Sequence, residues 1–431
     1  MPTYPFPSRA FRRNRERTSG LLFAFGVDDL SVAPTTGQTL TFTRATGRTV
    51  LDSLGRVVTL AHSQFPWGAQ YNSVAAIYEP VYDAQSARTN LCLQSEDLGT
   101  TWVAVGTPSR TAAALKCGDL ALDLIGDDDA AAVEGYTQAI TFTGDAVKAV
   151  ACFVAQGTST SSVIRLRDTS AAANRMACIL TWSGGLPSVT MGGGIGTYIG
   201  YVACANSVFR LLFQTTSVTA ANTNKVEIYP ATDAASTVTN TGTLYVGGVQ
   251  AQNAVAPGGY LKTTTATVTA NVDALSTSVT IPVADFTVYM RVARPDWAGL
   301  STGWATNLPL VGQPTTASNG RWVLEYDPAN QRVNASIAQA GSGQVAYQTI
   351  PATTQFDVCA QWTALGTAGK CRVDVGAGFS AYSSTVAAIS AWDSATLLIG
   401  AESTTAIGAG IRKILIASGA RTLAQMQGLN V

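Results

Sequence analysis

At 431 residues, the chain is too long for one ordinary hydrophobic core, and its length predicts two or three domains. Hydrophobic residues make up 46% of the sequence, which excludes wholesale disorder, while charged residues make up only 13%. Lys and Arg number 27, as do Asp and Glu, and this balance argues against an electrostatic grip on nucleic acid or on a membrane surface. The polar surface must use Thr, Ser, Asn, Gln and Gly, a composition that favours β-sheet over helix.

Residues 1–20 form a distinct segment, because prolines prevent a regular start and closely spaced arginines repel one another. Two interpretations stay open: a solvated terminus, or an anchoring arm that becomes ordered when it docks on an acidic protein surface. Binding of nucleic acid through one short cluster is the less favoured use. The arginines of this arm are Arg9, Arg12, Arg13, Arg15 and Arg17.

Residues 21–85 read as a small β lead-in region. The apolar run 21–27 is interrupted by Asp28 and is short for a signal peptide, and no run approaches the ~20 apolar residues that span a bilayer. We therefore expect a soluble protein that leaves its cell by a route other than secretion. Residues 49–58 predict a hairpin with its turn at 52–55, whereas the proline-broken aromatic segments 65–67 and 78–80 suggest packed coil.

Residues 86–265 predict a first β-sandwich, because short apolar strands alternate with turns rich in Gly, Ser and Asn. Residues 266–280 are rich in Thr, Ala, Val and Ser and read as a linker with some strand character. The candidate strands are residues 147–155, 163–167, 177–182, 209–215, 225–229 and 243–250.

Residues 281–431 predict a second β unit that ends in one short helix at 422–429. Phe286, Val288, Met290 and Val292 alternate and share one face of a strand. The candidate strands are residues 286–292, 321–326, 332–337, 356–362, 371–375, 396–399 and 411–417.

The seven cysteines are odd in number and contain no Cys-x-x-Cys spacing, so they indicate neither a disulfide framework nor a zinc site. Several lie within apolar strand-like runs. We interpret them as buried free thiols of a protein made in a reducing cytosol.

Two motifs frame the first sandwich. The first is Arg88-Thr89-Asn90 within residues 86–97, with Trp102 behind it, and the second is residues 244–250 closed by 257–261. Together they resemble the start and end of a β-sandwich module of tailed-bacteriophage virion proteins, of head-fibre or tail-fibre type, which is similar to carbohydrate-binding modules. The resemblance covers residues 40–275, and residues 42–45 resemble the lead-in of such proteins.

The order of strands and closing helix in residues 281–431 resembles the concanavalin A-like or laminin-G-like sandwich. The expected fold is therefore all-β: two jelly-roll or β-sandwich domains in tandem, preceded by an extended N-terminal arm and a small β lead-in. Enzymes of the concanavalin A-like fold carry a Glu-x-Asp-x-Glu pattern, and Glu325 and Asp327 match its first two acids. Ala329 stands where the third acid would be, so we expect no hydrolase.

Nucleophilic catalysis would have to use His62, the single histidine, which lies in a polar stretch without a nucleophile-elbow motif. No catalytic residue is therefore expected.

Asp127, Asp128, Asp129 and Glu134 form the one acidic cluster, and oxygen ligands on a loop suit calcium. A solvated turn is the favoured interpretation, because the ligand count and spacing of a defined calcium loop are missing. No other metal or cofactor is expected.

Exposed aromatic rings could bind a glycan by stacking on its sugar rings. Most tryptophans of such domains belong to cores. Trp297 and Trp304, in the loop 296–307, are the best candidates for exposed ones.

The resemblance implies a non-enzymatic structural component of a phage virion, a fibre, spike or decoration on head or tail. Its expected partners are capsid, portal or tail proteins and copies of itself, with a trimer favoured. It would be made in the host cytoplasm and lie on the virion surface. The alternative is an adhesin that recognises a host cell-surface polysaccharide.

Overall fold

The structure, a computed structural model, is built almost entirely from antiparallel strands. This confirms the all-β, sandwich-type fold class that the low content of charged residues predicted. Within the described ranges, no helix has the length and apolar character needed to cross a bilayer. The described residues are 21–26, 40–43, 46–61, 67–72, 77–83, 88–232, 240–255, 257–270, 274–279, 281, 283–293, 308–313, 320–327, 330–339, 341–350, 355–392, 396–399, 401–402, 405–406 and 410–427.

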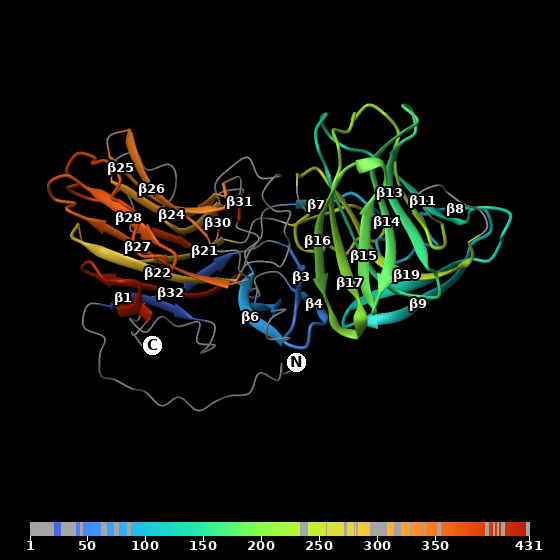
Figure 1. Cartoon of the computed structure of the whole chain (residues 1–431), viewed down its shortest axis with the longest axis horizontal. Coiled ribbons are helices and arrows are strands. Elements are labelled where there is room, and N and C mark those ends of the chain that lie inside the picture. The colour runs from blue at the N-terminus through green and yellow to red at the C-terminus, as the bar shows by residue number, and fades with distance from the viewer. Residues whose placement is uncertain are drawn as a thin grey trace.

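The first sandwich packs two six-stranded sheets face to face and lies at the right of Figure 1. One sheet runs, in spatial order, β16 (Thr197–Ala203), β17 (Phe209–Gln214), β12 (Ala149–Gln156), β19 (Gly242–Gln252), β10 (Leu120–Asp127) and β9 (Ser109–Cys117). The other runs β15 (Leu186–Met191), β14 (Ala173–Ser183), β13 (Ser161–Asp168), β18 (Asn224–Tyr229), β11 (Gly135–Ile140) and β8 (Val103–Val105). Two 3-10 turns, η1 (Gly192–Gly194) and η2 (Ala205–Ser207), flank β16.

Strand β12 is buried on both of its faces, which explains why its sequence is continuously apolar. Val150, Cys152 and Val154 belong to the core between the two sheets. Phe153, on the alternate face, belongs to a second cluster on the outer side of its sheet. That outer side therefore needs a cover of its own.

A hairpin of β3 (Arg48–Leu51) and β4 (Val57–Leu60) supplies that cover. The Asp52 carboxylate accepts hydrogen bonds from the backbone N–H groups of Leu54 and Arg56, both at 2.9 Å, so the turn falls where the sequence predicted it. Val57 is buried in the outer cluster, and its carbonyl accepts a hydrogen bond from the Asp119 N–H at 2.7 Å. This hairpin of the lead-in region thus packs on the first sandwich.

The second sandwich lies at the left of Figure 1 and consists of two seven-stranded sheets. One runs β28 (Lys370–Asp374), β27 (Gln355–Thr363), β22 (Phe286–Ala293), β32 (Gly410–Ser418), β6 (Ile77–Asp83) and β5 (Trp67–Asn72), with β1 (Leu21–Gly26) also on β32. The other runs β2 (Leu40–Thr43), β21 (Ala274–Ser278), β29 (Thr396–Ile399), β23 (Leu308–Gly312), β24 (Arg321–Asp327), β25 (Arg332–Gln339) and β26 (Ser342–Thr349). A small pair, β30 (Ala401–Glu402) and β31 (Thr405–Ala406), and the helix α1 (Leu423–Gln427) complete it.

Four strands of the lead-in region belong to this second sandwich. Strand β1 pairs with β32, with Phe25 opposite Ile414, and β2 pairs with β21. Strands β5 and β6 form a hairpin that joins β32 through Tyr82 and Asp83. The prediction of packed coil for residues 67 and 78–80 was wrong.

Pro80 explains part of that error, since proline normally argues against a strand. It lies outside the two residues of β6 that pair with β32, so its missing N–H removes no hydrogen bond on that side. The range 266–280, expected to be a linker with some strand character, contains the two short strands β20 (Val268–Ala270) and β21. Strand β20 pairs with β7 (Arg88–Asn90).

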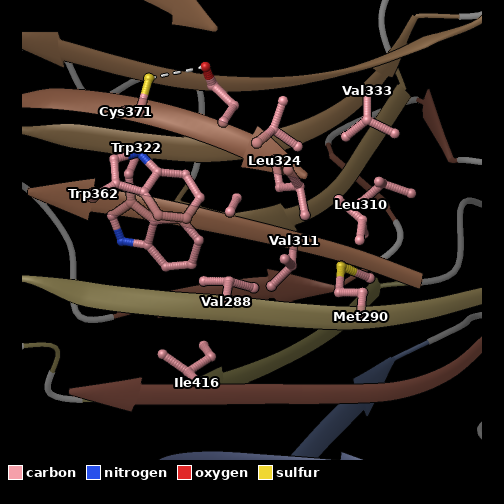
Figure 2. Packing of buried hydrophobic residues seen from close by; sticks show 14 of the residues in the cluster. Val288, Met290, Leu310, Val311, Trp322, Leu324, Val333, Trp362, Cys371 and Ile416 are labelled. Carbon is pink, nitrogen blue, oxygen red and sulfur yellow. Dashed lines mark hydrogen bonds between the residues drawn. The ribbon is translucent and has the colours of Figure 1, made fainter. Parts of the chain in front are cut away.

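The core of the second sandwich is centred on three aromatic rings. Phe286 stacks on Trp362 with ring centroids 5.0 Å apart, and Trp322 meets both rings edge-on at 5.2 and 5.1 Å. Figure 2 shows Trp322 and Trp362 beside the aliphatic residues of both sheets, with Val288 and Ile416 from one and Leu324 from the other.

One segment without regular structure, the edge strap (residues 376–392), runs along the free edge of β28. Between residues 380 and 389, the backbone N–H of every third residue donates a hydrogen bond back to residues 365–373. These donors are Ser380, Ser383, Val386 and Ile389, and the acceptors are the carbonyls of Val373, Cys371, Gly369 and Leu365. The strap satisfies groups that an open sheet edge would offer to another chain.

Candidate functional site

The two sequence motifs meet at one buried junction, which we call the motif clasp (residues 88–97 with 247–263). The Asn90 side chain is fully buried at its centre. Its amide donates to the carbonyls of Val249 and Leu261 at 3.1 and 2.9 Å, and its oxygen accepts from the N–H groups of Cys92 and Ala251 at 3.1 and 3.3 Å. Asn90 therefore ties the start of the sandwich to both parts of its end.

A second set of side chains extends the clasp. The buried Tyr260 hydroxyl lies 2.8 Å from Ser95 Oγ and donates to Glu96 Oε1 at 2.8 Å. Lys262 Nζ lies 2.7 Å from Glu96 Oε2. Burial and the neighbouring Glu96 carboxylate raise the pKa of Tyr260 well above its ordinary value, so the phenol stays protonated as a donor.

Gly248 shows why the second motif needs glycine. Its φ is +55°, and a Cβ there would lie 2.5 Å from the Phe153 ring. Trp102 is buried in the core between the sheets, as expected of most tryptophans in such a domain. The motif residues thus have structural roles in closing the sandwich.

The acidic cluster begins at Asp127, the last residue of β10, and its two end members, Asp127 and Glu134, are buried rather than solvated. The Asp127 carboxylate accepts hydrogen bonds from the N–H groups of Asp129 and Glu134 at 3.3 and 3.1 Å. Glu134 accepts from the N–H and hydroxyl of Thr107, both at 2.7 Å, and from the N–H of Asp128 at 3.2 Å. The expectation of a solvated turn was wrong for Asp127 and Glu134.

The pKa values of the Asp127 and Glu134 carboxyl groups shift in opposite directions, although both groups are buried. Burial raises the pKa of Asp127, whereas for Glu134 the hydrogen bonds from Thr107 and Asp128 outweigh burial and lower the pKa. Among the described residues, no group of three or more His, Cys, Asp or Glu side chains could hold a metal ion. The oxygens of Asp127 and Glu134 accept hydrogen bonds from N–H and hydroxyl donors of the protein, and the calcium site stays an untested prediction.

Glu325 and Asp327, the two acids of the partial hydrolase pattern, lie on β24, and Asp327 has a structural role at the end of the strand. Asp327 Oδ2 accepts hydrogen bonds from Asn330 Nδ2 at 2.8 Å and Arg332 Nε at 2.9 Å. Burial opposes ionisation of Asp327, but these hydrogen bonds lower its pKa overall. Glu325 is half-buried on the same strand.

The remaining predicted site residues lie outside the described residues. They are the arm residues Arg9, Arg12, Arg13, Arg15 and Arg17, the aromatic candidates Trp297 and Trp304, and His62.

Sequence reasoning missed a basic–aromatic cluster (Lys370, Arg372, Phe379, Tyr382) where the edge strap crosses β28. The Arg372 guanidinium lies 4.2 Å from the Phe379 ring centroid and 4.5 Å from that of Tyr382. Lys370 Nζ lies 4.3 Å from the Tyr382 centroid. Tyr382 is 38% exposed, and neither cation forms an ion pair with a described carboxylate. Positive charge beside an exposed tyrosine suits an anionic sugar.

A simpler neighbour lies on the outer strand β26. Tyr347 is 56% exposed, and the Arg332 guanidinium lies 4.3 Å from its ring centroid. Arg332 is already paired with Asp327, so its charge is compensated.

The fold is that of an all-β protein of packed antiparallel sheets. Polar residues such as Asn90 and Asp127 use their side chains to hold loops and strand ends in place. No protein-family model matches the chain, and no curated protein does either.

Proposed function

We propose that this chain is a non-enzymatic structural component of a tailed-phage virion, a surface fibre, spike or decoration protein on head or tail. The resemblance of the two motifs to a virion-protein module carries the proposal. The clasp supports it, because Asn90 and Glu96 are fully engaged in holding the sandwich closed and are not placed to react. Residues 1–20 would anchor the protein to capsid, portal or tail, and copies of the chain would associate, with a trimer favoured.

Mass spectrometry of purified virions tests this function. The protein is expected among the particle proteins at a stoichiometry that matches a symmetric assembly. A virus carrying alanine at all five arm arginines should produce particles that lack the protein, while the variant itself stays folded by circular dichroism. Absence of the wild-type protein from intact particles would overturn the proposal.

One observation favours the alternative, a host-receptor adhesin. The basic–aromatic cluster presents Lys370, Arg372 and the exposed Tyr382, and neither cation forms an ion pair with a described carboxylate. An array of acidic and neutral polysaccharides, probed with the full-length chain, tests this function. Binding to acidic glycans should be lost in Lys370→Ala and retained in Tyr347→Ala, the matched control. Binding to no glycan, or equal loss in both variants, would count against the adhesin.

A further inference from the structure

Two cysteines lie together on the outer side of the first sandwich, under the β3–β4 hairpin. Cys117 ends β9, and Cys204 follows β16. Both are buried in the same outer cluster, and each side chain is close enough to shift the pKa of the other. Their strands are the two opposite edges of one six-stranded sheet, so this contact is not a consequence of strand pairing.

The backbone around the two thiols is held in place from several directions. The Gly55 carbonyl accepts a hydrogen bond from the Ala205 N–H at 2.8 Å and lies 3.7 Å from Cys117 Sγ. Asn206 Nδ2 donates to the Lys116 carbonyl at 2.8 Å. The residues next to both cysteines are therefore joined by hydrogen bonds, which hold the two chain segments that carry the sulfurs beside each other.

Cys117 also differs chemically from the other cysteines. The neighbouring Cys204 side chain lowers the pKa of Cys117 below its ordinary value, which favours the thiolate form of Cys117. Burial raises the pKa of the thiols of Cys92, Cys152 and Cys178 in the main core. A nucleophilic sulfur thus lies beside a second sulfur that can resolve it.

We propose that Cys117 and Cys204 form a disulfide when the protein meets an oxidising low-molecular-weight disulfide such as oxidised glutathione. The Cys117 thiolate attacks one sulfur of the reagent, which forms a mixed disulfide and releases one glutathione thiolate that takes up the Cys204 proton. Cys204 then attacks the Cys117 sulfur and releases the second glutathione. Two electrons pass from the protein thiols to the reagent, which leaves as two reduced molecules.

The β3–β4 hairpin controls access to this pair. Within the described strands, it forms a two-stranded sheet of its own, and a bridge from Val57 to Gly118 connects it to the β9–β10 turn. Local opening of a small unit of this kind costs less free energy than global unfolding of the protein. The bond, once formed, would join the two edges of the sheet beneath the hairpin. This inference does not depend on the proposed virion function.

Peptide mapping of the full-length chain tests the proposal. Reduced protein is incubated with oxidised glutathione at neutral pH, blocked with an alkylating agent and digested without reductant. The expected product is one peptide pair joined through Cys117 and Cys204, with the other five cysteines alkylated. An unchanged set of seven free thiols in the folded protein, or a crosslink between other cysteines, would overturn the proposal.

Two serine variants separate the roles of the two sulfurs. Cys204→Ser should accumulate a glutathione adduct on Cys117, because the serine hydroxyl can still donate a hydrogen bond to the Cys117 thiolate but cannot resolve the mixed disulfide. Cys152→Ser, a matched control in the main core, should form the same 117–204 crosslink as the wild type. If Cys117 in the Cys204→Ser protein, with the fold intact by circular dichroism, acquires no adduct, the assignment of Cys117 as the attacking sulfur is wrong.

Discussion

The two sandwiches are closed in different ways. The first consists of one stretch of chain, and the clasp around Asn90 joins its beginning to its end. The second is assembled from distant pieces, because β1, β2, β5 and β6 complete sheets whose other strands come from residues 274–418. A few buried hydrogen bonds are enough to close the first sandwich, whereas the second needs whole strands from the other end of the sequence.

The second sandwich is therefore discontinuous in the sequence, although it forms one packed unit in space. The first sandwich sits as an insertion between β6 and β21, two strands of the second. Residues 46–60, by contrast, pack on the first sandwich and cover its outer face. The N-terminal region is thus shared between both halves of the molecule.

The largest expected difference between the two sandwiches is in the folding of isolated fragments. A fragment of residues 88–270 keeps the entire main core of the first sandwich and should unfold cooperatively in urea. A fragment of residues 281–431 loses the partners of β32 and β29, which leaves strand edges open, and it should aggregate. Circular dichroism and size-exclusion chromatography measure both. A soluble, cooperatively folded 281–431 fragment would contradict the shared construction of the second sandwich.

Removing the centre of the clasp should give the next largest effect. Asn90→Ala leaves buried carbonyl and N–H groups without partners and should lower the free energy of unfolding by about 3 kcal/mol. Thr89→Ala removes an exposed bond to Thr269 and should cost less than about 0.5 kcal/mol. Urea titration of fragment 88–270 measures both variants. Equal effects would show that the clasp is not the closing element.

Acid sensitivity should differ between the two sandwiches. Burial disfavours the Asp168 carboxylate, but hydrogen bonds from Arg175 and Asn222 outweigh it and lower the pKa to about 2. Since this lies below the ordinary 3.8, the carboxylate stabilises the fold above pH 3.8, and the contribution is lost as pH falls through about 2. Asp168→Asn should cost about 2 kcal/mol at neutral pH and flatten the pH dependence in that window.

Asp327 gives the matched substitution in the second sandwich. Its bonds to Asn330 and Arg332 span a local turn, so Asp327→Asn should cost only about 1 kcal/mol. Denaturation curves between pH 2 and pH 7 compare the two variants. A larger acid effect at Asp327 than at Asp168 would reverse the expected order.

The smallest effect is expected at the edge strap. Tyr382→Ala removes the ring that lies against Lys370 and Arg372 and should lower the free energy of unfolding by about 0.5–1 kcal/mol. Tyr347→Ala, with one such contact, should cost less. Thermal denaturation of the full chain measures the difference. No change in Tyr382→Ala would show that the ring does not help to hold the strap.

Strands with strong apolar patterns could be predicted closely. Residues 286–292 and 411–417 were expected as strands and form β22 and β32, because their alternating faces fill one core. Strand β9 carried no such signal, since its small residues are mostly exposed. The pairing of β1 with β32 left no local signal either, because pairing depends on the partner and not on the strand alone.

The site was less predictable than the fold. The motif residues could be singled out, but only the structure shows that Asn90 bonds to Val249 and Leu261, more than 150 residues away in the sequence. Lys370 and Arg372 alternate on a strand and so share a face, yet nothing in the sequence places Tyr382 against them. Contacts made by an irregular segment such as the strap depend on tertiary packing.

The pairing of β1 with β32 also governs how the chain can be synthesised. The ribosome makes residues 21–26 long before their partner residues 413–417. The first sandwich can fold while the nascent chain is still growing, because its own ends are 88 and 270. Until then, the apolar segment Leu21–Gly26 lacks its partner strand β32. Chaperone binding to the N-terminal part of the growing chain is the natural way to protect it.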